Sequence, residues 1–276
     1  MDVIESHAAQ LPAIDDRWTP RPYEREELIR GLLDGRMAGP FVSHPLDNVL
    51  HNIRLLCDGD PDKQFGLAGL PGGLTPWEIL ELVGRAAGFE PDPEATTGPV
   101  PVDPALVLEA CEAVGERLAF ACRRGERVIL ATGHPVGLAH LYMEVGRLLR
   151  GRGLEVLRPS EGMSWRDGDR HHVWQLRYLD GVAILTDKIS ARHTHSGEPM
   201  LRMLRESRPD LVFADHGFAG AAIESGVETI SIADVNDPAL LVAQALGRTE
   251  VVIVMDDNVQ PEDYWPCLQA IASRLP

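Results

Sequence analysis

In the first half of the chain, apolar residues recur at helical spacing between joints rich in proline and glycine. Leu28 and Leu32 lie four residues apart in the segment 24–37, and an apolar stripe runs through the segment 45–57. Thr75-Pro-Trp-Glu78 is a capping box with proline at the first helical position, and it predicts a helix to about residue 87. Asp103-Pro104 predicts another helix, to about residue 123, after a proline-rich loop over 90–101.

From Arg127 onward, short runs of Val, Ile and Leu are each followed by a segment of helical periodicity. The predicted strands are Val128–Ala131, Leu154–Leu157, His172–Tyr178, Gly181–Thr186, Leu211–Ala214, Glu228–Ile232 and Val251–Met255. The predicted helices are Leu138–Arg150, Glu198–Glu206, Phe218–Ser225, Pro238–Leu246 and Pro261–Arg274. Alternation of apolar strands with helices predicts a parallel sheet that is covered on both faces. Leu179-Asp180 is an expected hairpin turn between two antiparallel strands.

The expected fold is therefore α/β: a Rossmann-like, mostly parallel sheet in a three-layer sandwich with an N-terminal helical region. Residues 1–124 are expected to form the helical cap region and residues 125–276 the α/β core, within one compact unit. Open sheets of this kind bind ligands beyond the carboxyl ends of their strands, and right-handed crossovers bring those ends to one edge. The residues that follow each strand thus indicate where a site lies.

Asp, Asn and His residues follow most of these strands, whereas the opposite ends contain no histidine once the antiparallel strand His172–Tyr178 is set aside. Four of the ten histidines fall on this one edge, namely His134, His193, His195 and His216. Aspartate is common in such loops because it forms turns and caps helices, but histidine is not. This asymmetry predicts an active or binding site at the edge.

The loop Thr132-Gly-His-Pro-Val-Gly137 joins a strand to a helix and contains two glycines. Its backbone N–H groups and the following helix N-terminus are suited to hold an anion such as phosphate, although a plain tight turn is equally compatible. It is neither a Walker loop nor a G-x-G-x-x-G fingerprint. Thr132, Gly133, His134 and Gly137 are the substrate-binding candidates here, together with Lys188.

Catalytic candidates follow two other strands. His193 and His195 alternate in an extended segment, so both imidazoles lie on one side, either as metal ligands or as proton donors. Asp215 ends a strand next to His216, and it is the best candidate for a metal ligand, nucleophile or general base. A polar loop with a helix cap at Ser196 is the alternative reading of the first segment.

Carboxylates and amides at the same edge suit a hard divalent cation. The candidate metal ligands are Asp215, Asp234, Asn236, Asp256 and Asp257. Asp237 precedes a proline and is expected to cap a helix instead. Mg²⁺ or Mn²⁺ is the expected ion, although Asp256 and Asp257 also fit an ordinary solvated turn.

The N-terminal half adds one polar group. His44, Asn48 and His51 are spaced to share one helix face, which predicts either a lid over the sheet edge with substrate-binding side chains or an ordinary polar helix surface. A further polar cluster, a candidate for substrate binding, comprises Trp165, Arg166, Arg170, His171 and His172.

The chain has 42 acidic and 26 basic residues and a net charge of -16, which disfavours nucleic acid and anionic lipid as partners. The four cysteines are widely separated and form no CxxC pair, as expected for reduced thiols in a cytoplasmic protein. No signal peptide or membrane-spanning stretch is recognised. The sequence leaves homo-oligomerisation open.

Three segments resemble a poorly characterised actinobacterial family usually labelled "phosphatase": 132–137, 215–224 and 233–238. The resemblance extends from about residue 20 to the end and implies phosphatase activity, but it assigns no catalytic residues. A helical part before a sheet with Asp and Asn at strand ends is also similar, more weakly, to metal-dependent damage-control phosphatases. Their Asp-Asn-Ala-Gly-Glu signature is absent.

Two functions are consistent with these observations. The first is a metal-dependent phosphatase that hydrolyses a small phosphorylated metabolite, with phosphate oxygens held by the Gly133–Gly137 turn. The alternative is a non-hydrolytic α/β protein that binds or isomerises a phosphosugar or a nucleotide at the same edge without a metal ion.

Overall fold

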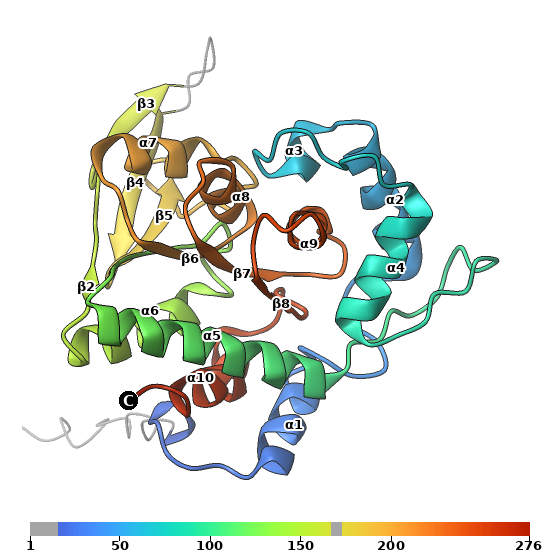
Figure 1. Ribbon diagram of the computed structural model, residues 1–276, viewed down its shortest axis with the longest axis horizontal. Coiled ribbons are helices and arrows are strands. Elements are labelled where there is room, and N and C mark those ends of the chain that lie inside the picture. The colour runs from blue at the N-terminus through green and yellow to red at the C-terminus, as the bar shows by residue number, and fades with distance from the viewer. Residues whose placement is uncertain (1–15, 167–172) are drawn as a thin grey trace, which may run out of the picture.

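The computed structural model describes residues 16–166 and 173–276 and shows an α/β protein built on one mostly parallel sheet (Figure 1). The strands are β1 (Arg127–Ala131), β2 (Glu155–Val156), β3 (Ser164–Arg166), β4 (Val173–Leu179), β5 (Val182–Thr186), β6 (Leu211–Asp215), β7 (Thr229–Ala233) and β8 (Val251–Val254). The helices are α1 (Arg25–Asp34), α2 (Leu46–Cys57), α3 (Pro61–Gln64), α4 (Pro76–Ala87), α5 (Pro104–Arg124), α6 (Ala139–Gly151), α7 (Glu198–Glu206), α8 (His216–Glu224), α9 (Ala239–Ala245) and α10 (Trp265–Ala272). Two 3-10 turns are η1 (Asp16–Trp18) and η2 (Pro261–Tyr264). The predicted fold class is confirmed.

The strands of the sheet lie in the order β3-β4-β5-β1-β6-β7-β8, and β2 pairs with the beginning of β1. β5, β1, β6, β7 and β8 are parallel, so their carboxyl ends share one edge. β4 runs antiparallel to both β3 and β5. The expected hairpin is confirmed, because Leu179 pairs with Val182 across the turn.

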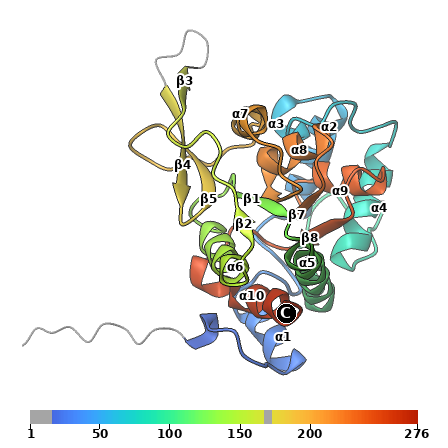
Figure 2. The same cartoon turned by 60° about the vertical axis from the view of Figure 1, so that its left-hand side comes forward.

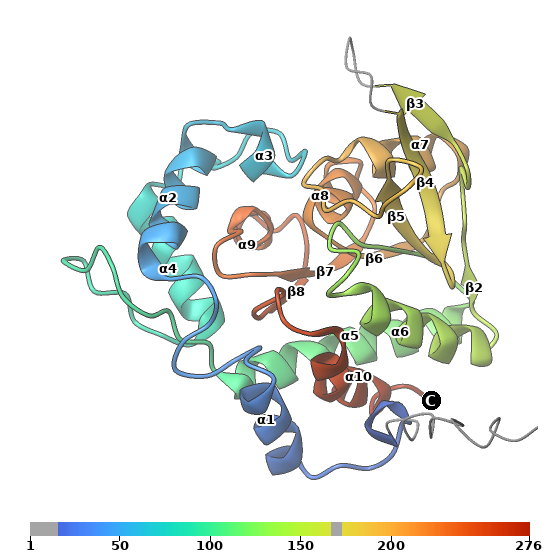
Figure 3. The same cartoon turned by 180° about the vertical axis from the view of Figure 1, so that it is seen from behind.

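Helices cover both faces of the sheet. α5, α6 and α10 pack on one face, while α7, α8 and α9 lie on the other (Figures 1 and 2). α1 packs outside α5 and α10. α2, α3 and α4 form a group beside α9, at the opposite end of the molecule from the β3–β4 hairpin (Figures 1 and 3).

The core strands are buried on both sides, as their continuous apolar sequences predict. Every residue of β5, β6 and β7 is buried. Small residues in α8 allow a close approach to the chain that follows α3, since a Cβ atom added at Gly220 would lie 2.1 Å from the carbonyl oxygen of Phe65. The N-terminal region therefore packs directly against the helical layer that borders the strand ends.

Several elements differ from the sequence predictions. α3, β3 and the 3-10 turns were not predicted, and β2 has two residues instead of the four expected. α8 begins at His216, two residues earlier than expected, and His216 has a left-handed φ of 45°. The expected last helix is a 3-10 turn followed by α10.

The helical region and the sheet contribute to one hydrophobic core, and α5 packs on both α10 and β8. The division near residue 124 stays a prediction. Arg170, His171 and His172, part of the polar cluster named from the sequence, lie outside the described residues. None of the helices described is long and apolar enough to cross a lipid bilayer.

Candidate metal centre

Four histidines meet at the carboxyl edge of the sheet. The ring centroids of His193 and His195 each lie 5.0 Å from that of His216, and the ring of His134 lies 5.8 Å from it. His134 follows β1, His193 and His195 follow β5, and His216 follows β6. Three neighbouring parallel strands therefore bring together the histidines that the sequence placed on one edge.

Three of these histidines form a group with the dimensions of a metal site. One ring nitrogen of each of His193, His195 and His216 lies within 4.8 Å of the others. Nitrogens that each bind one ion at ~2.1 Å lie at most ~4.2 Å apart, so the three rings would move slightly inward to hold a common ion. The structure thus adds His216 to the pair for which metal ligation was considered from the sequence.

Backbone contacts explain why His193 and His195 lie on the same side. The intervening Thr194 is buried, and its amide donates a hydrogen bond of 3.0 Å to the carbonyl oxygen of Gly133. Its hydroxyl accepts a hydrogen bond from the Ser196 amide. Because side chains alternate along an extended segment, anchoring Thr194 directs both neighbouring imidazoles away from it.

Asp215 holds its neighbours in place. Its Oδ2 atom accepts a 2.6 Å hydrogen bond from the Thr132 hydroxyl, and its Oδ1 atom accepts one from the Gly133 amide. The Nδ1 atom of His216 lies 3.5 Å from Oδ1. With both oxygens engaged and no exposed surface, Asp215 is placed to position His216 and the Thr132–Gly133 turn. A role for Asp215 as ligand or nucleophile stays a prediction.

The turn that was expected to bind phosphate uses its first N–H groups internally. The Gly133 amide donates to Asp215, and the His134 amide donates to the Thr132 hydroxyl. These two groups are therefore not free to donate to an anion. Gly137 instead provides space for the His134 ring, since a Cβ atom there would lie 2.7 Å from Nδ1 of His134.

Two further carboxylates flank His216. Its Nε2 atom lies 3.6 Å from Oδ2 of Asp237 and 3.7 Å from Oδ2 of Asp257. Burial opposes the charged form of His216, but its contacts with Asp215 and Asp237 raise its pKa well above the ordinary value. Burial, together with the charges of neighbouring carboxylates, raises the pKa of Asp257 to about 7, against the opposing effect of His216.

The other three imidazoles have lowered pKa values, which favours their neutral form. Burial is the main cause that lowers the pKa of His134, His193 and His195, and it lowers that of His193 to about 4. The charge of His216 lowers all three values further. A neutral imidazole is the form that binds a metal ion, so His216 would have to release its proton when an ion binds.

The short helix α3 supplies residues that the sequence analysis missed. Oδ2 of Asp62 lies 2.9 Å from Nδ1 of His195, and the ammonium group of Lys63 lies 3.6 Å from Oδ1 of Asp237. Phe65 packs against the rings of His195 and His216. The signal for this helix is Asp60-Pro61, the same start sequence as Asp103-Pro104.

The expected lid is present in part. Nε2 of His44 lies 3.4 Å from Oδ2 of Asp234. The side-chain amide of Asn236 donates a 3.1 Å hydrogen bond to Oδ1 of Asn48. His51, in contrast, is exposed. The neighbouring Asn52 contacts the sheet edge instead, because its side-chain amide donates a hydrogen bond to the backbone carbonyl oxygen of Asn236. His44 precedes α2, so helix spacing from His44 does not identify the residues that face the sheet.

Lys188 and Asp256 are placed differently from the other candidates. Lys188 is exposed in the turn that follows β5, where its amide donates to the Thr186 hydroxyl. Asp256 is buried, and its two oxygens accept hydrogen bonds from the amides of Ser43 and Asn258. Asp256 thereby anchors the segment that carries His44.

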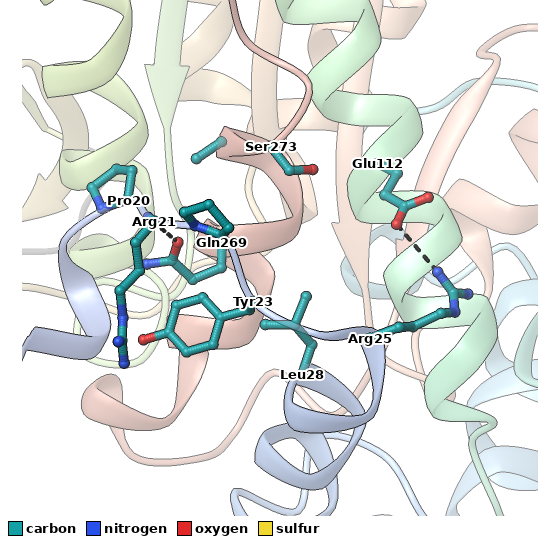
Figure 4. A pocket seen from close by; sticks show the side chains of 10 residues that line it. Pro20, Arg21, Tyr23, Arg25, Leu28, Glu112, Gln269 and Ser273 are labelled. Carbon is teal, nitrogen blue, oxygen red and sulfur yellow. Dashed lines mark hydrogen bonds and ion pairs between the residues drawn. The ribbon is translucent and has the colours of Figure 1, made fainter.

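Cavities lie both beside the histidines and far from them. A cavity of about 320 Å³ beside the cluster is lined by Trp165, Arg166, Trp174, Leu185, His193, Thr194, Ser196, Glu198, Pro199 and Arg202. A larger one, of about 530 Å³, lies between the N-terminal segment and α10, where Arg21 and Gln269 meet (Figure 4). No histidine lines the larger cavity, so only the smaller one adjoins the candidate centre.

Comparisons with known proteins agree on one family. The model of the protein family described as Phosphatase matches residues 23–275. The chain is 36% identical over 257 residues to Phosphatase SCO2771 of Streptomyces coelicolor, and the match covers 91% of this chain and 95% of that protein. No solved structure matches the chain.

Proposed function

Because the chain belongs to the family described as Phosphatase, we propose that it hydrolyses the phosphate ester of a small metabolite with a divalent metal ion bound by His193, His195 and His216. The observation that supports this proposal is the approach of the three imidazoles within 4.8 Å at the carboxyl edge of the sheet. That edge is where open α/β sheets bind ligands.

The donor set favours a borderline ion. Imidazole nitrogens suit Zn²⁺ and other transition metals, whereas Mg²⁺ prefers oxygen ligands. With nearby carboxylates, the site suits Zn²⁺ or Mn²⁺ better than Mg²⁺. Such an ion, when bound, polarises a phosphoryl oxygen and lowers the pKa of a water molecule.

Residues around the three histidines orient them. Asp62 contacts Nδ1 of His195, and Asp215 lies beside Nδ1 of His216. Carboxylates in this position fix the tautomer and the direction of a ligating imidazole. In His195 this leaves Nε2 available for the ion, whereas Nε2 of His216 also faces Asp237 and Asp257.

Two further groups are suited to contact the substrate. The ring of His134 lies 4.8 Å from that of His193, and it is the edge imidazole outside the three-histidine group. The adjoining cavity contains Trp165, Trp174, Arg166 and Arg202, which suit an organic group that carries negative charge. Its volume of about 320 Å³ matches a small metabolite.

Phosphate release from a panel of phosphorylated metabolites tests the proposal. Metal-free protein is reloaded with Zn²⁺, Mn²⁺ or Mg²⁺, and activity is expected only with metal. His195→Ala is expected to lower kcat/KM at least a hundredfold, whereas the control His140→Ala, which removes a histidine that packs on Trp18, keeps activity.

Two results would contradict the proposal. Equal phosphate release with and without metal would remove the ion from the mechanism. Stabilisation by a phosphosugar or nucleotide that a chelator does not abolish, without phosphate release, would favour the non-hydrolytic alternative.

A further inference from the structure

A second group of polar atoms lies beside the three histidines. Asp234 has no exposed surface, and its Oδ1 atom accepts a hydrogen bond from the Val235 amide. Its Oδ2 atom has no hydrogen-bond partner among the described residues and lies 3.4 Å from Nε2 of His44. Two ligands that share an ion at ~2.1 Å in tetrahedral geometry are separated by roughly the same distance.

Two more buried oxygens are left without donors in the described part of the chain. The Oδ1 atom of Asn236 accepts no hydrogen bond, although its amide nitrogen is bound to Asn48. The Oδ2 atom of Asp257 also accepts none. A buried carboxylate or amide oxygen without a donor is costly unless a cation or a proton satisfies it.

The charges in this region are unbalanced. Four buried carboxylates lie in the segments that follow β7 and β8, namely Asp234, Asp237, Asp256 and Asp257. Lys63 faces Asp237, and His216 faces Asp237 and Asp257. His44 is the basic group that contacts Asp234. A cation bound at this point would contact the oxygens that lack donors, and its charge would offset the repulsion between the carboxylates.

We propose that His44 and Asp234, with Asp257 and the side-chain oxygen of Asn236, bind a second divalent cation next to the three-histidine site. Asp257 borders the three-histidine group, since its Oδ2 atom is 3.7 Å from Nε2 of His216. One imidazole and several oxygens suit Mn²⁺ or Zn²⁺. The role of this ion in hydrolysis rests on the proposed function, but its binding does not.

His44 is anchored for this role. The neighbouring Ser43 amide donates a 2.7 Å hydrogen bond to Asp256, and Gly39 forms a bridge with Val102. These contacts fix the segment that directly precedes His44, and Ser43 is held next to the strand ends. The N-terminal region thus supplies a ligand to a site whose other members follow β7 and β8.

Metal stoichiometry tests the second site. Metal-free protein is saturated with Mn²⁺, desalted, and measured by mass spectrometry of the metal, with electron paramagnetic resonance of the bound Mn²⁺. We expect two ions per chain and a magnetically coupled signal in the wild type. Asp234→Asn is expected to bind one ion, with an uncoupled signal.

Two further variants complete the experiment. His44→Gln changes a partly exposed side chain, so it tests the site even if Asp234→Asn does not fold. It is expected to weaken binding of the second ion at least tenfold. Asp210→Asn removes a carboxylate at the opposite end of β6, where Asp210 pairs with Arg127, and it is expected to retain two ions.

The outcomes separate this proposal from the proposed function. One ion per chain in an active wild type would overturn the second site and leave the three-histidine site intact. Two ions and a coupled signal in both His44→Gln and Asp234→Asn would overturn the assignment of these residues. No bound ion in the wild type would overturn both proposals.

Discussion

Asp62 holds His195 across 133 residues of sequence, with 2.9 Å between Oδ2 of the carboxylate and Nδ1 of the imidazole. The carboxylate comes from α3 of the N-terminal region, and the imidazole lies in the segment that follows β5. A hydrogen bond to Nδ1 leaves Nε2 free to bind a metal ion. The helical region therefore helps to form the centre and does not only cover it.

Replacing Asp62 tests this relationship. Asp62→Ala is expected to weaken metal binding by about 10- to 100-fold, because a ligating histidine loses its orienting carboxylate. Stability is expected to change little, within about 0.5 kcal/mol, because the Asp62 side chain is 62% exposed. Metal titration and urea unfolding measure the two effects. Asp58→Ala, an exposed carboxylate at the end of α2, is the control, and equal metal affinity in both variants would contradict the role.

Gly217 makes room for the segment that carries His195. A Cβ atom at Gly217 would lie 2.1 Å from the carbonyl oxygen of His195 and 2.3 Å from the carbonyl carbon of Ser196, both of which are backbone atoms. Gly217→Ala is therefore expected to displace His195, to weaken metal binding at least tenfold, and to destabilise the fold by about 1–3 kcal/mol.

A glycine with open space around it is the matched control for that variant. Gly151 ends α6 and has nothing within 4 Å of an added Cβ atom. Gly151→Ala is expected to be neutral or slightly stabilising, by up to about 1 kcal/mol. Metal titration and thermal unfolding compare the two variants. Wild-type metal affinity and stability in Gly217→Ala would contradict the prediction, because the backbone at this position would then have moved at no cost.

The hydroxyl of Thr132 links two parts of the centre, since it donates to Asp215 and accepts from the His134 amide. Thr132→Val keeps the shape but leaves both groups without this partner, so a loss of about 1–3 kcal/mol in unfolding free energy is expected. Thr132→Ser keeps the hydroxyl and is expected to lose less. Urea unfolding at pH 7 distinguishes them, and a serine variant as unstable as the valine variant would argue against the hydrogen bonds.

An ion pair away from the centre gives a pH-dependent prediction. The hydrogen bond from Arg117 lowers the pKa of Glu228 below its ordinary value of 4.5, despite partial burial. A lowered pKa means that the stabilisation is complete above pH 4.5 and disappears as the pH falls below it. Glu228→Gln is therefore expected to be less stable than the wild type at pH 7, and the difference is expected to shrink as the pH falls through the lowered pKa.

The expected size of this difference is below about 1 kcal/mol, because the Glu228 side chain is 52% exposed and water screens the pair. Denaturant unfolding of both proteins at several pH values measures it. A difference that grows as the solution becomes more acidic would contradict the sign.

Much of the fold follows from local sequence patterns. Val128–Ala131 and Leu211–Ala214 are continuous apolar runs and are buried core strands. The capping box at Thr75 starts α4 as predicted. β3 was missed because Ser164, Trp165 and Arg166 show no apolar alternation, and they form a strand by pairing with β4. Pairing with β4, and not local β propensity, therefore accounts for the strand β3.

The candidate centre was predictable where strand order alone brings residues together. His134, His193, His195 and His216 follow neighbouring parallel strands, so one edge gathers them. The contribution of Asp62 and Lys63 was not predictable, because it depends on how the N-terminal helices pack against α8. For the same reason, the sequence did not distinguish Asn52 from His51 on α2.

The hydrogen bond between the Ser43 amide and Asp256 joins segments 213 residues apart. During translation, a nascent chain that already carries all four edge histidines still lacks Asp256 and Asp257. The Ser43 amide therefore lacks its acceptor until the segment after β8 has left the ribosome, whereas Val42 can already pair with Val100. The proposed second cation site, which includes Asp257, is therefore complete only after the last strand of the sheet has been synthesised.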